Sequence, residues 1–157
     1  MNRSLKMMLA VMVLICAGHR GSSQSVIPDM APVIKKMQDS VVKTEREGDV
    51  VDDVLYDYIF REQSSVSDYY YQLFVKQDYT FKVIPDDGGN TNYMIRIYRK
   101  LGNDWTLQIQ SASGGTTPVV RFTPVGTEPE RYKISVSCDL NSAKQASCFG
   151  LLIVRAE

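Results

Sequence analysis

The chain has 157 residues, of which 44% are hydrophobic and 23% charged, and its 18 basic residues balance its 18 acidic residues. This length suits one domain with its own core, and the ordinary hydrophobic content argues against disorder over most of the chain. The absence of net charge excludes a general electrostatic attraction to nucleic acid or to anionic membranes.

Residues 1–23 have the three-part pattern of a secretory signal peptide. Arg3 and Lys6 give a basic start, an apolar run of 11 residues covers positions 7 to 17 (MMLAVMVLICA), and small and polar residues follow up to Ser23. The run is too short to remain in a bilayer as a spanning helix. We therefore predict cleavage after Ser23 and an exported protein, periplasmic or secreted, with no integral membrane segment.

Cleavage at this point would remove Cys16 and also His19, the only histidine of the chain. A lipoprotein is the less favoured alternative, because Leu14 and Ile15 are not the small residues that should precede a lipid-modified Cys16. Residues 1–23 hold three basic residues and no acid, so the remainder has 15 basic and 18 acidic residues, a net charge of −3. Without histidine, a serine or cysteine triad and a histidine-ligated zinc or iron site are excluded.

Residues 24–49 are predicted to form a leader with a short helix. Pro32 suits the first turn of a helix, while Val33, Met37 and Val41 recur at helical spacing and Gly48 is a sensible stop. A β-sandwich domain is expected over residues 50–157. At its start, residues 55–60 fit a strand as well as a helix, and the run is too short for periodicity to decide.

From residue 67 onward hydrophobic residues alternate with polar ones, as in strands with one buried face. The alternating sets are Tyr69, Tyr71, Leu73 and Val75; Tyr79, Phe81 and Val83; Tyr93, Ile95 and Ile97; Trp105, Leu107 and Ile109; Val120 and Phe122; and Tyr132, Ile134, Val136 and Cys138. Residues 148–154 form a last strand that is apolar on both faces. Turn residues separate the sets, and no helix lies between them. We predict an all-β fold, an antiparallel β-sandwich or jelly roll of seven or eight strands, preceded by one N-terminal helix.

Cys138 ends one predicted strand and Cys148 begins the next, with nine residues between them. If the two strands form an antiparallel hairpin, the sulfurs meet at the neck of its loop. In an oxidising compartment we expect a disulfide there, which would stabilise the fold by about 2.7 kcal/mol. A redox dithiol or a metal site is disfavoured, because neither the spacing nor the number of ligands fits.

Acidic residues offer two further chemistries. Asp78, Asp86, Asp87 and Asp104 could supply the carboxylate pair of a glycoside hydrolase, although turns and strand ends place acids there anyway. A calcium ion is the one cofactor that these residues could hold. It would find oxygen ligands at Asp86, Asp87 and Asn90, or at Asp49, Asp52 and Asp53. Neither set has the spacing of an EF-hand loop, and ordinary turn and linker chemistry is the favoured interpretation of both.

Three tyrosines are the best candidates for ligand contact. Tyr58, Tyr70 and Tyr98 fall on strand faces opposite the predicted core residues. Exposed tyrosines on a sheet can stack on sugar rings or anchor a protein partner. The simpler interpretation is that tyrosine suits the surface of any β-sheet.

Several segments of the C-terminal half carry a family resemblance. They are residues 94–98 (MIRIY), 102–104 (GND), 118–124 (PVVRFTP), 132–137 (YKISVS) and 148–151 (CFGL). Over residues 69–155 the chain resembles the bacterial pre-peptidase C-terminal domain, and more closely its small stand-alone exported relatives. The resemblance implies a β-sandwich accessory module without catalytic residues. Some relatives bind collagen or polysaccharide, and some bind calcium near the segment entering the sandwich, where residues 45–53 lie here.

These features together predict an exported, non-catalytic module for binding or assembly at the bacterial cell envelope. Its partner would be a polysaccharide or an envelope protein, not a nucleic acid. The alternatives are a hydrolase with paired carboxylates and a purely structural envelope protein.

Overall fold

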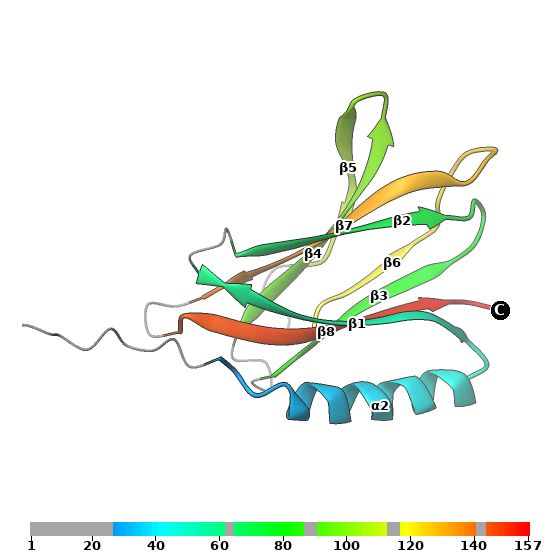
Figure 1. Cartoon of the computed structure of the whole chain (residues 1–157). Coiled ribbons are helices and arrows are strands. Elements are labelled where there is room, and N and C mark those ends of the chain that lie inside the picture. Colours follow the sequence, from blue (N-terminus) through cyan, green and yellow to red (C-terminus); the bar gives the residue numbers. More distant parts are fainter. Residues whose placement is uncertain (1–26, 62–64, 87–90, 113–116, 141–143) are drawn as a thin grey trace, which may run out of the picture.

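The computed structural model describes residues 27–61, 65–86, 91–112, 117–140 and 144–157. Over these residues the chain forms one helix, α2 (Ala31–Arg46), and eight strands in two layers (Figure 1). The strands are β1 (Val50–Phe60), β2 (Val66–Leu73), β3 (Tyr79–Pro85), β4 (Asn92–Leu101), β5 (Asp104–Gln110), β6 (Val119–Phe122), β7 (Glu130–Asp139) and β8 (Ala146–Arg155).

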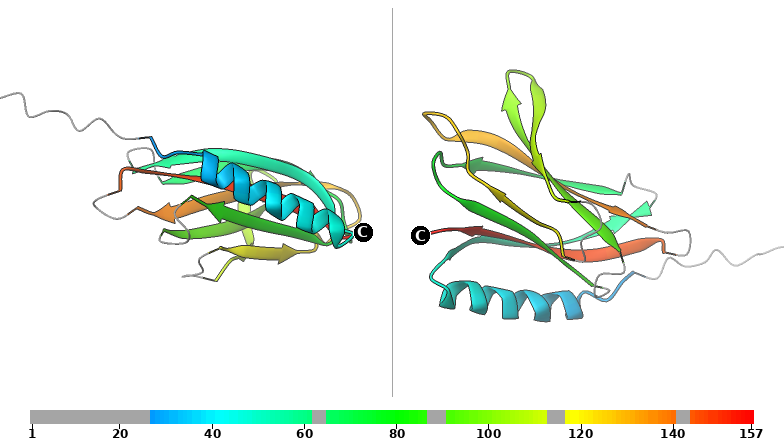
Figure 2. Two further views of the ribbon diagram at one scale, coloured as in Figure 1. Left: turned by 90° about the horizontal axis from the view of Figure 1, so that it is seen from below. Right: turned by 180° about the vertical axis from the view of Figure 1, so that it is seen from behind.

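The strands form two four-stranded antiparallel sheets that pack face to face. One has the order β1-β8-β3-β6 and is called here the helix-side sheet, because α2 lies across its outer face (Figure 2). The other, the open sheet, has the order β2-β7-β4-β5. Every connection crosses from one sheet to the other except the β4–β5 hairpin, which makes the fold a jelly roll. The predicted all-β sandwich with a helix at its N-terminal side is confirmed.

Residues 55–60, which the sequence left open between strand and helix, belong to the edge strand β1. This strand pairs with β8 over its length, with Leu55 opposite Leu151 and Ile59 opposite Ser147. Leu55 and Ile59 turn toward the core between the sheets, while Val54 packs on the helix side. Alternation between two apolar environments explains why this segment has hydrophobic residues at both helical and strand spacing.

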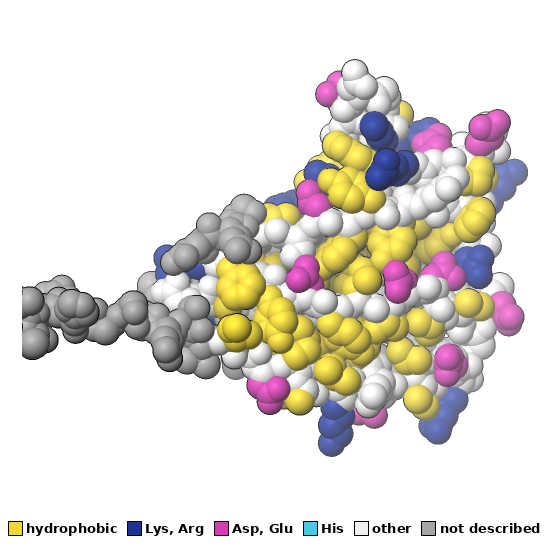
Figure 3. Space-filling model, viewed as in Figure 1, with side chains coloured by type: hydrophobic (Ala, Val, Ile, Leu, Met, Phe, Trp, Pro, Cys, Tyr) yellow, Lys and Arg dark blue, Asp and Glu magenta, His cyan; other side chains and the backbone are white. Residues whose placement is uncertain are grey.

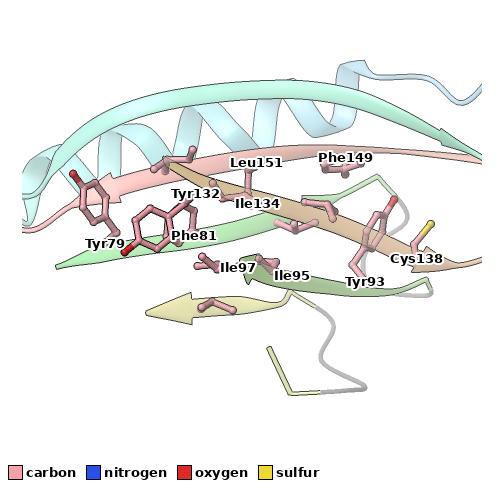
Figure 4. Packing of buried hydrophobic residues seen from close by; sticks show 14 of the residues in the cluster. Tyr79, Phe81, Tyr93, Ile95, Ile97, Tyr132, Ile134, Cys138, Phe149 and Leu151 are labelled. Atoms are coloured by element: carbon pink, nitrogen blue, oxygen red, sulfur yellow. The ribbon is translucent and has the colours of Figure 1, made fainter. Parts of the chain in front are cut away.

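The inward faces of both sheets supply the main core. Its largest buried side chains are aromatic and come from both layers: Tyr79, Phe81 and Phe149 from the helix-side sheet and Tyr93 and Tyr132 from the open sheet (Figure 4). All of these residues except Phe149 belong to the alternating sets in the sequence, which therefore marked the core faces of β3, β4 and β7 correctly.

A second, smaller core lies between α2 and the helix-side sheet. Met37 from the helix packs here against Leu152 and Val154 of β8 and Ile84 of β3. β8 is thus buried on both faces, as its continuous apolar sequence predicts. Gly150 makes the close approach of helix and sheet feasible, because a Cβ at this position would lie 2.3 Å from Met37 Cε.

No disulfide joins Cys138 to Cys148 in the structure, and the hairpin on which that prediction depended does not form, since β7 and β8 belong to different sheets. Cys138 points into the main core, whereas Cys148 points to the helix side, where its thiol lies 3.4 Å from the carbonyl oxygen of Asp29. Burial, followed by the nearby Asp86 carboxylate, raises the pKa of the Cys148 thiol to about 12. A thiol with that pKa is a poor nucleophile at neutral pH.

Residues 1–23, with the predicted signal peptide, Cys16 and His19, lie outside the described residues. In the part of the chain that is described, no helix is long and apolar enough to span a membrane.

Candidate functional site

The register of the open sheet brings two of the three predicted tyrosines into one row. Tyr70 of β2 lies opposite Lys133 of β7, and Lys133 lies opposite Tyr98 of β4. Their neighbours along each strand, Tyr69, Ile134 and Ile97, all belong to the core side. Because successive side chains of a strand alternate between faces, Tyr70, Lys133 and Tyr98 share the outer face of the open sheet.

Trp105, the only tryptophan of the chain, joins this row from β5. Its ring centroid lies 5.6 Å from that of Tyr70, at an interplanar angle of 50°. The sequence pattern grouped Trp105 with Leu107 and Ile109, but the β4–β5 pairing shifts at this point. Ile109 pairs with Ile97, whereas Leu107 pairs with the next residue, Tyr98. The irregularity reverses the alternation and turns Leu107 and Trp105 outward.

We call the cluster formed by Tyr70, Tyr98, Trp105 and the basic residues around them the aromatic face. Lys133 Nζ lies 4.7 Å from the ring centroid of Tyr98 and 5.8 Å from that of Trp105. Arg131 lies over Tyr70 with its Cζ 5.3 Å from the centroid, and Lys100 Nζ is 5.9 Å from Trp105. All four separations are within the range of cation–π attraction.

The aromatic face is partly open to solvent, with Tyr98 and Trp105 half-buried. Tyr70 is 51% exposed and Leu107, which pairs with Tyr98, is 46% exposed. In Figure 3, hydrophobic and basic side chains gather side by side over β2 and β7, at the base of the β4–β5 hairpin. Lys133 is held more firmly than its neighbours, since its side chain is only 19% exposed and forms an ion pair with Asp68 at 3.4 Å. Asp68 also accepts a hydrogen bond from Ser135.

Tyr58, the third predicted tyrosine, lies elsewhere. It is on β1 opposite Cys148, on the helix side of the other sheet, and is half-buried. Its ring stacks on that of Phe60, with centroids 6.1 Å apart. The structure therefore brings Tyr70 and Tyr98 together but leaves Tyr58 apart. It also adds Trp105, Arg131, Lys133 and Lys100, which the sequence patterns had not singled out as site residues.

The candidate carboxylates have protein partners where they are described. Asp86 accepts a hydrogen bond from Ser147 at 3.1 Å and lies 3.5 Å from Lys144 Nζ, and Asp78 accepts one from Thr123. Asp104 is exposed at the start of β5. Asp87 lies outside the described residues, so the paired-carboxylate hydrolase stays a prediction.

Two of the three calcium candidates near the start of β1 have protein partners, and Asp49 stands just before the strand. Asp52 pairs with Arg155 at 3.3 Å, and Asp53 accepts a hydrogen bond from Tyr71 at 2.7 Å. Asp87 and Asn90 of the other candidate set lie outside the described residues. Among the residues that are described, no three acidic, cysteine or histidine side chains come together as a metal would require.

One hollow lies beside the helix, with a volume of about 480 Å³. Its lining is Lys36, Ser40, Lys82, Ile84, Pro85, Thr117 and Val119. Among these lining residues there is no carboxylate pair and no aromatic ring on which a ligand could stack. The aromatic face is the stronger candidate site.

No family model matches the sequence, and no curated protein matches it. Solved structures do resemble it. The mitogen of Yersinia pseudotuberculosis aligns with a TM-score of 0.50 and 10% identity, over 66% of this chain and 86% of that one. The pre-peptidase C-terminal domain of a Bacillus anthracis collagenase aligns with a TM-score of 0.48 and 10% identity, over 66% and 89%.

A third similar structure is a protein described as CBM4, with a TM-score of 0.41 and 16% identity, over 70% of this chain and 79% of that one. The resemblance to pre-peptidase C-terminal domains that the sequence indicated is thus found among solved structures too. At these identities the likenesses concern the fold alone.

Proposed function

We propose that this protein is an exported, non-catalytic binding module that holds a polysaccharide of the bacterial cell envelope on its aromatic face. The observation that carries the proposal is the convergence of Tyr70, Tyr98 and Trp105, from three different strands, on one exposed sheet surface. An aromatic ring offers a large, rigid and partly apolar contact at low entropic cost, and sugar rings present C–H groups that pack against it.

The position of the rings also supports binding without catalysis. They stand on a sheet face whose backbone is fixed by pairing on both sides in β7 and β4, so the surface is preorganised. Asp68, two residues from Tyr70 on the same face of β2, is tied to Lys133 and Ser135 and serves to position the lysine. An open surface of this kind suits a polymer that passes across it, because both ends of the ligand can leave the site.

The test is binding to an array of immobilised neutral and acidic glycans. We expect Tyr70→Ala and Trp105→Ala each to lower affinity for the bound glycan at least about tenfold, which corresponds to about 1.4 kcal/mol. Tyr56→Ala is the matched control, because Tyr56 is 42% exposed on the helix-side sheet. Unchanged binding by Tyr70→Ala and Trp105→Ala would place the site elsewhere, and the absence of glycan binding would remove the proposal.

A further inference from the structure

The aromatic face differs from a simple stacking platform because its rings already hold cations of the protein itself. Arg131 lies over Tyr70, Lys133 over Tyr98 and Trp105, and Lys100 near Trp105. A platform for a neutral sugar needs free ring faces. Here part of each ring is used to fix a positive charge at the surface.

The outer face of the open sheet is positive, although the chain as a whole has no net charge. Its outward positions, as the strand register places them, carry the basic residues Arg96, Lys100, Arg131 and Lys133 and the acidic residues Asp68 and Asp139. Four basic and two acidic side chains give a net charge of +2. Asp139 stands at the far end of β7 opposite Asn92, away from the rings.

One of the two acids on this face, two residues from Tyr70 along β2, is already paired with a cation. Asp68 forms an ion pair with Lys133 and accepts a hydrogen bond from Ser135. This leaves Arg131 and Lys100, both exposed, as charges beside the rings that face solvent. The rings restrict the motion of these long side chains, which lowers the entropy that they lose when they bind an anion.

We infer that the ligand of the aromatic face is an acidic polysaccharide, whose carboxylates bind Arg131 and Lys100 while its sugar rings contact Tyr70 and Leu107. This inference rests on the proposed function and makes its ligand class specific. Arg131 can bind a carboxylate through two parallel hydrogen bonds, and Lys100 contributes a point charge. The exposed Leu107 beside Tyr98 continues the apolar surface on which a sugar ring can lie.

The experiment compares acidic polysaccharides with their own neutral derivatives. Polygalacturonate, alginate and hyaluronate are each tested against the same polymer after methyl esterification, which removes the charge and keeps the sugar rings. We expect at least one acidic form to bind about tenfold more tightly than its ester. The affinity should fall as salt rises, because the exposed charges are screened.

Two double variants test the residues. Lys100→Gln with Arg131→Gln should lower affinity for the acidic polymer at least about tenfold and weaken its salt dependence. The control is Lys35→Gln with Arg121→Gln, which removes the same charge from exposed residues on α2 and β6. The control should bind within about twofold of the unchanged protein. Circular dichroism and thermal unfolding establish that both variants are folded.

The outcomes separate this inference from the proposed function. Equal or tighter binding of the esters, with loss of binding in Tyr70→Ala, overturns the acidic ligand and leaves a neutral-glycan site. An unchanged affinity in Lys100→Gln with Arg131→Gln also overturns it. Tighter binding to single-stranded oligothymidylate, or to phosphatidylglycerol vesicles at equal charge, would assign the face to another polyanion. The absence of binding to any glycan, neutral or acidic, removes the proposed function itself.

Discussion

At the scale of single residues, two buried tyrosines of the main core differ in how their hydroxyl groups are satisfied. The hydroxyl of Tyr93 lies 2.7 Å from Ser147 Oγ and 3.2 Å from the carbonyl oxygen of Cys148. Ser147 in turn donates a hydrogen bond to Asp86. The hydroxyl of Tyr132 is buried and, within the described residues, has no hydrogen-bond partner. A buried polar group without a partner costs free energy that its aromatic ring must offset.

Replacing each tyrosine by phenylalanine therefore has opposite expected effects. Tyr132→Phe should leave the free energy of unfolding unchanged or raise it by up to about 1 kcal/mol, because it removes an unsatisfied hydroxyl. Tyr93→Phe should lower it by about 1–3 kcal/mol, because a buried hydrogen-bonded group loses its partner. Chemical denaturation followed by circular dichroism measures both. An equal loss in the two variants would mean that the Tyr132 hydroxyl is satisfied in solution.

At the scale of elements, the strands follow the alternation of the sequence except where pairing is irregular. The core faces of β3, β4 and β7 can be predicted because one residue in two is hydrophobic and points inward. The outward turn of Trp105 cannot, since it depends on a register shift between β4 and β5 that leaves no local mark in the composition. The sequence could therefore indicate Tyr70 and Tyr98 as outward residues, but not the complete aromatic face.

The hairpin expected between Cys138 and Cys148 does not form, for a related reason. The spacing of Cys138 and Cys148 fits a hairpin, but the alternation of each strand says nothing about which strand it will pair with. In a jelly roll, strands that are neighbours in the sequence mostly lie in different sheets. Local pattern thus determines which face of a strand is buried, whereas the topology determines which side chains meet.

The packing of α2 on the helix-side sheet depends on the missing side chain at Gly150. In Gly150→Ala, the new methyl group would lie 2.3 Å from Met37 Cε and 3.3 Å from Val33 Cγ1, so the helix or Met37 must move. We expect the free energy of unfolding to fall by about 1–3 kcal/mol. Met37→Ala alone should cost about 2–5 kcal/mol through the cavity it leaves.

A double-mutant cycle shows whether the two positions act on each other. In the Met37→Ala background the Gly150→Ala substitution should cost less, because its methyl group then enters the vacated space. We expect a coupling free energy above about 1 kcal/mol, measured by chemical denaturation of the four proteins. Additive losses would mean that Gly150 matters for β8 and not for the contact with α2.

At the scale of the whole molecule, the two layers have different roles. The helix-side sheet is buried on both faces along β8 and holds the smaller core under α2. The open sheet has no helix on its outer face within the described residues, and this is the face on which the rings and the basic side chains gather (Figures 1 and 3). The helix-side sheet, packed on both faces along β8, thus supports the open sheet, whose outer face remains accessible to a ligand.

Side-chain hydrogen bonds also join the two layers along one edge of the sandwich. Tyr69 and Tyr71 of β2, in the open sheet, donate hydrogen bonds of 2.7 Å to Asp57 and Asp53 of β1, in the helix-side sheet. The second oxygen of each carboxylate accepts a backbone hydrogen bond at 2.8 Å, from the N–H of Tyr58 and of Val54. Figure 3 shows acidic side chains in a line among hydrophobic ones between β1 and β2. We call these two pairs the edge clasp.

Because of the edge clasp, the free energy of unfolding should vary with pH in the alkaline range. Burial, followed by the hydrogen bond to the paired aspartate, raises the pKa values of Tyr69 and Tyr71 above the ordinary value for tyrosine. In the unfolded chain a tyrosine loses its proton near pH 10. The stabilisation from the neutral hydroxyls is therefore complete below about pH 10 and declines as pH rises further, because the unfolded state then binds fewer protons than the folded state.

We expect the free energy of unfolding to fall gently from pH 8 to 9, where the Cys148 thiol with its raised pKa contributes, and more steeply between pH 10 and 11.5, where the two tyrosines contribute as well. A Tyr69→Phe and Tyr71→Phe double variant should be less stable by about 2 kcal/mol at pH 8, since two hydrogen bonds to carboxylates are lost. Its stability should then fall less steeply above pH 10, because these two groups no longer titrate. Urea denaturation at each pH measures both proteins, and Tyr56→Phe, a substitution at an exposed tyrosine, serves as a control whose clasp is intact. Parallel pH profiles for the double variant and the unchanged protein would show that the two layers are held at this edge by packing alone.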